Sequence, residues 1–225
     1  PLTVSEFIDK KSEGSAGLPA RPVLLTFDDG FADFYEGALP ALRKYDFKAT
    51  LYIVTKYIGD TGRWLVREGE GNRPMLNWEQ VLEINAAGIE CGGHTHTHPQ
   101  LDTIPHARVR EEVSLCKQIL EDKLNQEVRS FAYPFGYHTA AIKEIVRESG
   151  YSSACAVRYE MSLEDTDQFA LTRLRADPST SVARLEALLT SDTPSLFVEA
   201  YKRARVPLWR LARRCSAPVT KRIAV

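Results

Sequence analysis

The sequence is poor in cysteine and lacks any long apolar run. Its 225 residues include four cysteines, which are widely spaced and form no C-x-x-C pair. This spacing argues against a zinc ribbon or a redox dithiol, so we expect the four to be small buried side chains. No run approaches the roughly 18–20 apolar residues that span a bilayer, and the opening PLTVSEFIDKK lacks the apolar core of a secretory signal. Since the chain begins with Pro1, both a cytoplasmic location and export after signal removal stay open.

The chain also lacks a net charge of either sign. Its 29 basic and 30 acidic residues give a formal charge of −1, which does not favour a nucleic-acid partner. Residues 196–225 differ, because eight lysines and arginines there face Glu199 alone. We expect a basic C-terminal helical extension covering the floor of the fold, with peripheral contact to an anionic membrane as the alternative. The composition otherwise fits one domain over residues 1–225, and the sequence does not predict an oligomeric state.

Short runs rich in β-branched and aromatic residues alternate with segments of helical periodicity. We predict strands over 22–27, 48–54, 88–93, 129–134, 152–157 and 169–176, and helices over 35–47, 77–88, from about 105 onward, and over 139–150. Strands separated by helices favour parallel pairing through right-handed crossovers. A G-x-G-x-x-G fingerprint is absent, which favours a barrel of β/α units over an open dinucleotide-binding sheet. Functional residues of such a barrel lie at the carboxyl ends of the strands.

Two predicted helices have clear boundary signals, and one long segment has none. Asn77 can cap the start of the 77–88 helix and Gly88 can end it. Apolar residues recur every three or four positions after Pro105, which predicts one buried face of a long helix. The stretch 54–74 contains four glycines and Trp64, and we expect it to form a loop over one face of the barrel.

Acids and histidines follow two of the predicted strands. Asp28 and Asp29 come directly after PVLLTF, and three of the five histidines lie in GGHTHTHPQL, after the third strand. Because His94 and His98 are four residues apart, we expect both rings to face one point on a single helical turn. A carboxylate from another strand end would complete a metal site of two histidines and one acid. The alternatives are a histidine-rich surface turn and a hydrogen-bonded structural pair.

Adjacent aspartates suit a division of roles. In an extended backbone their side chains point to opposite sides, so one can bind a metal while the other accepts a proton from water. This arrangement favours metal-assisted hydrolysis. In FAYPFGYH, Pro134 and Gly136 bracket Phe135, whose backbone N–H could point into the site as an oxyanion donor. A simple strand-to-helix turn is the alternative interpretation of that segment.

Three motifs carry a family resemblance. TFDDG, HTHTHP read as H-T-x-x-H-P, and YPFG occur in this order between about Pro22 and Arg175. They resemble the motifs of the polysaccharide deacetylases, also called NodB-homology or carbohydrate esterase family 4 proteins. The resemblance implies an α/β fold, a distorted (β/α)7 TIM-like barrel. It also implies a divalent cation, usually zinc with cobalt or nickel as alternatives, and removal of N- or O-acetyl groups from sugars.

The resemblance also implies a role for each matching residue. By position, Asp28 would be the general base, and Asp29, His94 and His98 would be the metal ligands. The backbone N–H of Phe135 would be the oxyanion donor. His96 falls at a variable position of the motif and receives no ligand role.

Two departures from the family pattern bear on catalysis. Ala132 stands where many members carry an arginine that orients the base, and Arg173 is a candidate to supply that guanidinium from a neighbouring strand. The late leucine-x-x-histidine motif, whose histidine acts as general acid, is missing, since no histidine follows His138. Protonation of the leaving group would then fall to His138, to Asp28 or to water.

We therefore predict a metal-dependent hydrolase that removes an acetyl group from an amino sugar in a glycan or glycan precursor. A deformylase or amidase acting on another N-acyl substrate would keep the same site. A catalytically weakened carbohydrate-binding pseudoenzyme is a further alternative, because of Ala132 and the missing late histidine.

Overall fold

The computed structural model describes residues 1–14, 17–157, 167–176 and 179–190. The predicted basic extension over 196–225, with Cys215, lies outside these residues. Of the four cysteines, Cys91, Cys116 and Cys155 are buried free thiols, which confirms their expected role as small core side chains. Within the described chain, no helix has the length and apolar character needed to cross a membrane.

Five parallel strands form one sheet. They are β1 (Thr26–Phe27), β2 (Thr50–Ile53), β3 (Glu90–Gly93), β4 (Ser130–Ala132) and β5 (Ser153–Cys155). Each lies inside a predicted strand and pairs with the next strand of the sequence, in the order β1-β2-β3-β4-β5. The order never reverses as it does in a dinucleotide-binding sheet, so the crossovers all progress in one direction, as in a barrel. The sixth predicted strand, 169–176, contributes a single parallel bridge from Leu171 to Cys155.

Helices connect the strands. They are α1 (Val4–Ser12), a π-helical turn (Phe34–Ala38) leading into α2 (Leu39–Lys44), α3 (Trp78–Ala86), α4 (His106–Leu124), α5 (Ala140–Glu148) and α6 (Val182–Thr190). The Asn77 side chain accepts from the Gln80 N–H, and Gly88 has a φ of 84°, so both predicted ends of α3 are confirmed. Segment 54–74 contains two short 3₁₀ turns, Thr55–Tyr57 and Arg63–Glu68, and one antiparallel bridge from Thr61 to Pro74. We did not predict α1 and α6.

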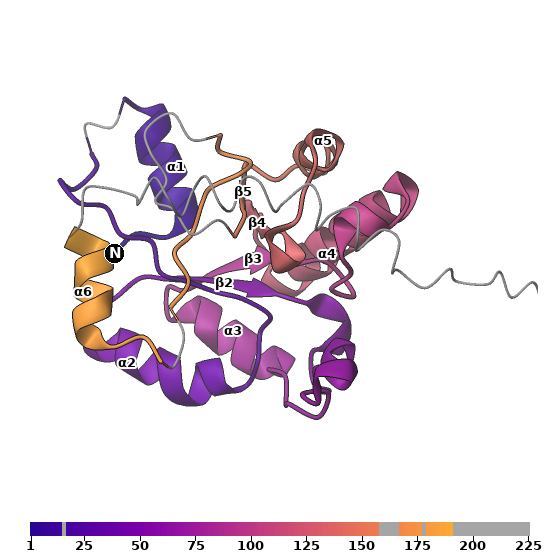
Figure 1. Cartoon of the computed structure of the whole chain (residues 1–225), viewed down its shortest axis with the longest axis horizontal. Coiled ribbons are helices and arrows are strands. Elements are labelled where there is room, and N and C mark those ends of the chain that lie inside the picture. Colours follow the sequence, from indigo (N-terminus) through magenta and orange to yellow (C-terminus); the bar gives the residue numbers. More distant parts are fainter. Residues whose placement is uncertain (15–16, 158–166, 177–178, 191–225) are drawn as a thin grey trace, which may run out of the picture.

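Side chains of the strands alternate between two apolar clusters. Leu51, Ile53 and Phe131 point outward and pack with buried side chains of α3, α4 and α5 in the main core. Figure 1 shows α2, α3, α4 and α5 placed around the outside of the strands. Tyr52 and Cys155 point to the other face and pack with α1 in a second, smaller cluster. The second cluster is therefore the interior of the curled sheet.

Helix α1 covers the end of the sheet where the strands begin (Figure 1). Its Val4 N–H donates to Thr50 Oγ1 of β2 over 3.0 Å, and Ser5 donates to the Glu90 carboxylate of β3. Val4 and Ile8 are buried in the interior cluster. The opposite end, where the strands finish, is left for the loops that follow them.

Candidate active site at the carboxyl ends of the strands

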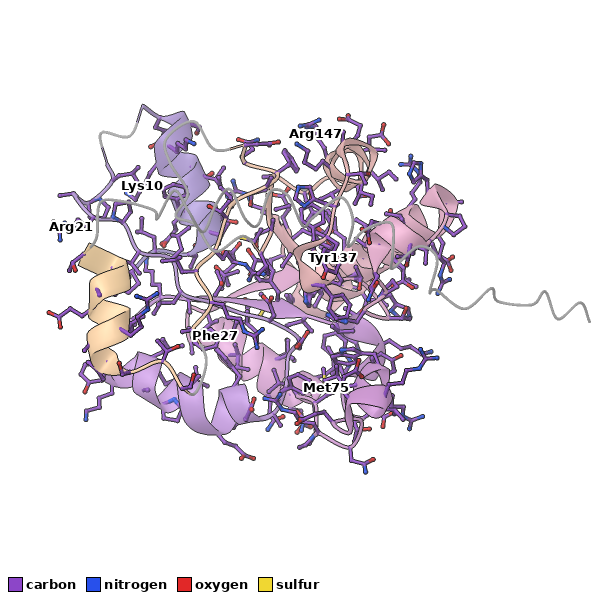
Figure 2. All side chains as sticks on the ribbon, viewed as in Figure 1. Lys10, Arg21, Phe27, Met75, Tyr137 and Arg147 are labelled. Atoms are coloured by element: carbon purple, nitrogen blue, oxygen red, sulfur yellow. The ribbon has the colours of Figure 1, made fainter. Side chains whose placement is uncertain are left out.

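The predicted site residues lie in loops that leave the same end of the sheet. Asp28 and Asp29 follow β1, His94 and His98 follow β3, and Phe135 follows β4. Because the strands are parallel and adjacent, their carboxyl ends share one edge of the barrel, and the loops there meet. In Figure 2, Tyr137 and Met75 lie toward that end, far from Lys10 on α1 and from Arg21.

Asp29, His94 and His98 form a compact cluster. Asp29 Oδ1 lies 3.4 Å from His94 Nε2 and 3.2 Å from His98 Nε2. One ligand atom from each of the three residues lies within 4.8 Å of the other two. Ligand atoms of a tetrahedral zinc site, with bonds of about 2.0–2.1 Å, are about 3.3 Å apart, so this donor set fits such an ion. The structure thus brings together the three predicted metal ligands.

The backbone brings the histidines together in an unexpected way. Residues 94–98 do not form the helical turn that we expected, because Thr95 has a φ of 68° and His98 a φ of 59°. Asp29 also has a positive φ, 76°, so Asp28 and Asp29 do not lie in one extended segment as assumed. Convergence of the two rings was correctly predicted, but the reason was wrong. Local left-handed residues aim these side chains, and sequence spacing does not reveal them.

Asp28 has a different partner from Asp29. The Arg173 guanidinium donates to both of its carboxylate oxygens, over 2.6 Å to Oδ1 and 2.8 Å to Oδ2. Arg173 also donates to Thr26 Oγ1 and to the Ala156 carbonyl, which fixes the plane of the guanidinium. An arginine therefore meets the predicted base although Ala132 occupies the motif position. This arginine, Arg173, lies 145 residues after Asp28 in the sequence.

The two aspartates are held ionised by different partners. Burial would raise the pKa of Asp28, but the Arg173 charge lowers it below its usual value. Burial would likewise raise the pKa of Asp29, but its contacts with the His94 and His98 rings outweigh burial and lower that pKa below its usual value. Burial would lower the pKa of His94, but the neighbouring Asp29 and Asp28 carboxylates raise it above its usual value. At His98 the effect of burial is the larger one, so the pKa of His98 is lowered. Both carboxylates thus favour the charged form that a base and a metal ligand require.

His96 takes no part in this cluster. Its Nδ1 lies 3.0 Å from Thr55 Oγ1, in the loop that follows β2. This contact fits the variable position of His96 in the motif, to which no ligand role was assigned. The three-histidine segment therefore divides into two rings that face Asp29 and one that packs against the neighbouring loop.

The YPFG segment forms a tight 3₁₀ turn in which Phe135 has a φ of 58°. Gly136 and Tyr137 donate their N–H groups back to Tyr133 and Pro134, while the Phe135 N–H has no backbone acceptor among the described residues. Its ring is 43% exposed and meets the His98 ring edge-on at 4.8 Å. The turn thus places Phe135 beside the cluster.

His138 is buried against a core side chain that follows β4. Its ring stacks on Tyr133 at 4.7 Å, and Tyr133 belongs to the main core on the helix-covered side. Its Nδ1 lies 3.2 Å from the Gly136 carbonyl. His138 is thus held against the Tyr133 ring and the turn that contains Gly136.

Two further residues contact the candidate site: Trp64, which lies in the loop that we expected over one face of the barrel, and Glu112, which we did not assign from the sequence. Trp64, in the 54–74 loop, packs on the His98 ring at 5.0 Å and on Phe31 at 5.6 Å. Glu112 of α4 is 1% exposed and hydrogen-bonded to Thr97, within the histidine segment. The sequence held a signal for Glu112, because it lies three residues after Val109 and four before Cys116, inside the apolar stripe of the helix.

The sequence comparisons agree on one family. The family described as polysaccharide deacetylase matches residues 15–154. The Bacillus subtilis protein YxkH is 28% identical over 169 residues, covering 75% of this chain and 56% of that protein. The poly-beta-1,6-N-acetyl-D-glucosamine N-deacetylase of Staphylococcus aureus is 26% identical over 173 residues, covering 73% and 54%. The chain thus spans about half the length of these curated relatives.

Solved structures share the fold. The Streptococcus pyogenes deacetylase PplD, in complex with acetate, matches with a TM-score of 0.71 and 28% identity, over 84% of this chain and 79% of that one. IcaB from Ammonifex degensii matches in fold with a TM-score of 0.68 and 24% identity, over 84% and 82%. The predicted fold class, a distorted β/α barrel of the NodB type, is confirmed by these matches. With the family match extending over most of the barrel, the chain belongs to the polysaccharide deacetylase family.

Proposed function

We propose that this chain is a metal-dependent deacetylase that removes the acetyl group from an N-acetylated amino sugar in a glycan. The observation that carries the proposal is the Asp29, His94 and His98 cluster with the Arg173-paired Asp28 beside it. A relative with a named activity supports it, since the Staphylococcus aureus protein is a poly-beta-1,6-N-acetyl-D-glucosamine N-deacetylase.

The residues present suit a divalent cation such as zinc. His94 Nδ1 lies 2.7 Å from the Ala132 carbonyl and so carries the proton, which leaves Nε2 as the free lone pair facing Asp29. Two imidazoles and one carboxylate are a common ligand set for zinc enzymes, and they leave positions for water and substrate. A bound cation would supply Lewis acidity, which polarises the amide carbonyl and lowers the pKa of water.

Asp28 is suited to accept the proton of the attacking water. Arg173 fixes its orientation through two hydrogen bonds and keeps it deprotonated, and each carboxylate oxygen retains a further lone pair. The same carboxylate, once protonated, can return the proton to the departing amine. This role for Asp28 needs no late histidine, and it fits the packing of His138 against Tyr133.

The Phe135 N–H is suited to stabilise the negative charge that develops on the acyl oxygen. It has no backbone acceptor among the described residues, and its turn is rigidified by Pro134 and by the hydrogen bond from Gly136 to Tyr133. A preorganised donor of this kind lowers the barrier most when it needs no rearrangement during the reaction.

Aromatic rings beside the ligands suit a sugar substrate. Phe135 and Tyr137 stack at 6.1 Å, and both Phe135 and Trp64 pack against the His98 ring. Aromatic side chains offer a large apolar surface, against which the C–H groups of a pyranose ring can pack. The 54–74 loop therefore contributes a wall of the proposed substrate site through Trp64.

One assay tests the proposal against its alternatives. Purified protein is measured for bound zinc, cobalt and nickel, and then for acetate and formate release from a panel of N-acetylated and N-formylated oligosaccharides. We expect about one metal ion per chain and metal-dependent release of acetate. Formate release alone would indicate a deformylase, and sugar binding without acyl release would indicate a pseudoenzyme. Acetate release that persists after complete removal of metal would contradict the proposed mechanism.

A further inference from the structure

The turn between the two histidine ligands is strained. Thr95 and His98 both have positive φ values, 68° and 59°. A β-branched residue such as threonine is an outlier in this region, because its side chain crowds the backbone. Such residues persist only where the surrounding structure holds them in place. Within the turn itself, the His98 N–H donates to Thr95 Oγ1 over 3.0 Å, which links the two strained residues.

The two ligand rings are held in different ways. His94 is fixed through its own ring, by the 2.7 Å contact from Nδ1 to the Ala132 carbonyl. His98 Nδ1 is buried and has no hydrogen-bond partner among the described residues. Metal-binding histidines usually use this second nitrogen to fix the ring. The orientation of His98 therefore depends on the backbone of its turn and on the rings packed around it.

Glu112 holds that backbone from outside the turn. Its Oε2 accepts the Thr97 N–H over 2.7 Å, and its Oε1 accepts the Thr97 hydroxyl over 2.6 Å. The Glu112 carbonyl accepts the His96 N–H over 3.1 Å. Arg108, one helical turn earlier, donates to Oε1 over 2.9 Å and partly offsets the buried charge. Both residues that separate Thr95 from His98 are thus hydrogen-bonded to Glu112.

We propose that Glu112 is a positioning residue that orients His98 toward Asp29 by holding the 95–98 turn in its strained conformation. The inference rests on the proposed metal site. A carboxylate on the apolar face of a helix is costly to bury, and nothing in the packing of α4 requires one at this position. Its hydrogen bonds replace the missing contact at His98 Nδ1, because they fix the backbone that carries the ring.

The test compares Glu112 with a matched carboxylate on the same helix. Glu121 of α4 accepts the Val128 N–H over 3.0 Å, so it also holds a backbone N–H, at a distance from the histidines in the sequence. The variants are Glu112→Met, Glu112→Gln, Glu121→Met and Glu121→Gln in the full chain. Zinc affinity is measured on metal-free protein by competition with a chromophoric chelator, and the visible spectrum of the cobalt form reports ligand geometry. Thermal unfolding of the metal-free proteins measures stability separately.

We expect Glu112→Met to weaken zinc binding by about 10- to 100-fold and to change the cobalt spectrum, with a smaller effect from Glu112→Gln, which keeps one acceptor. The Glu121 variants should bind zinc as the wild type does, even where they unfold at a lower temperature. Wild-type affinity in both Glu112 variants would overturn the proposal. An equal loss in the Glu121 variants would also overturn it, because it would indicate general destabilisation.

Failure of the metal site and failure of the positioning role are distinguishable. If the wild-type protein binds no zinc, the proposed function is wrong, and amide hydrogen exchange of metal-free protein still tests Glu112. Glu112→Gln should then speed amide exchange at Thr97 and His98 by at least about tenfold. Glu121→Gln should instead speed amide exchange at Val128 and leave Thr97 and His98 unchanged. Unchanged exchange at Thr97 in the Glu112 variants would overturn the positioning role regardless of zinc.

Discussion

At the end of the sheet where the strands begin, α1 meets them with paired polar groups and apolar side chains. At the end where they finish, the chain adopts positive φ values at Asp29, Thr95, His98 and Phe135. Buried nitrogens of His98 and Trp64 there have no partner among the described residues. In a β/α barrel the first end contributes mostly to stability and the second to function. Asp46 and Asn125, in the loops that precede β2 and β4, also have positive φ values, but the strained residues at the second end include the candidate site residues, which indicates that this end is shaped for chemistry.

The contrast is clearest in two arginine–aspartate pairs of the same geometry. Arg129 at the start of β4 donates through two nitrogens to Asp9 of α1, over 2.8 and 2.5 Å. Arg173 makes the same forked contact with Asp28. The Arg129 pair is half-buried, whereas the Arg173 side chain is mostly buried. The same pairing thus ties a helix to the sheet at one end and orients a candidate base at the other.

The largest effect should follow from Asp29→Asn at the carboxyl end. Loss of the carboxylate removes a ligand, so we expect zinc affinity to fall by at least about 100-fold. Replacing a residue that only holds a ligand in place typically lowers metal affinity by less, about 10- to 100-fold. Deacetylation should fall with it. Chelator competition and acetate release measure the two effects. Full zinc affinity in this variant would break the assignment of Asp29 as a ligand.

Asp28→Asn should separate catalysis from metal binding. An amide cannot accept the proton of water, so we expect turnover to fall by about 100- to 10,000-fold. Zinc content should stay at the wild-type level, because Asp28 faces Arg173 rather than the two histidines. Steady-state kinetics and metal analysis of the same preparation test this. Unchanged turnover would show that another group takes the proton.

The two arginines should give opposite results when each is replaced by lysine. Arg173→Lys loses the forked contact that fixes Asp28, and we expect kcat to fall by about 10- to 100-fold with little change in KM. Arg129→Lys should leave kcat unchanged and lower the free energy of unfolding by no more than about 1 kcal/mol, since its ion pair is partly open to solvent and the lysine keeps the charge. Kinetics and chemical denaturation of both variants provide the comparison. Equal kcat values in the two variants would break the contrast.

Ile8→Ala should alter stability alone. Ile8 is buried in the interior cluster between α1 and the strands, so we expect a loss of about 2–5 kcal/mol in the free energy of unfolding. The zinc affinity of the folded protein should not change, because Ile8 lies on α1, which covers the end of the sheet opposite Asp29. Denaturant unfolding and chelator competition measure the two quantities. A weaker zinc site in folded Ile8→Ala would show that the ends are coupled.

The sequence predicted elements and residues whose signals are local. Strand cores within 48–54 and 88–93, the Asn77 cap and the apolar face of α4 follow from side-chain periodicity and capping chemistry over a few residues. The three motif residues Asp29, His94 and His98 converge in space, as predicted. Helix α1 was missed although Thr3 and Glu6 form a capping box, since the segment is short and its apolar residues are few.

By itself, then, the sequence determined the parallel β/α order, the family motifs and the three residues that meet in the cluster. Only the tertiary structure decided that Arg173 reaches Asp28, that left-handed residues rather than a helical turn aim the histidines, and that Glu112 holds their turn. The physical reason is range. Periodicity and capping are fixed by neighbours a few residues away, whereas contacts spanning 145 residues, or strain supported by another helix, exist only once the strands have curled together and brought distant segments into contact.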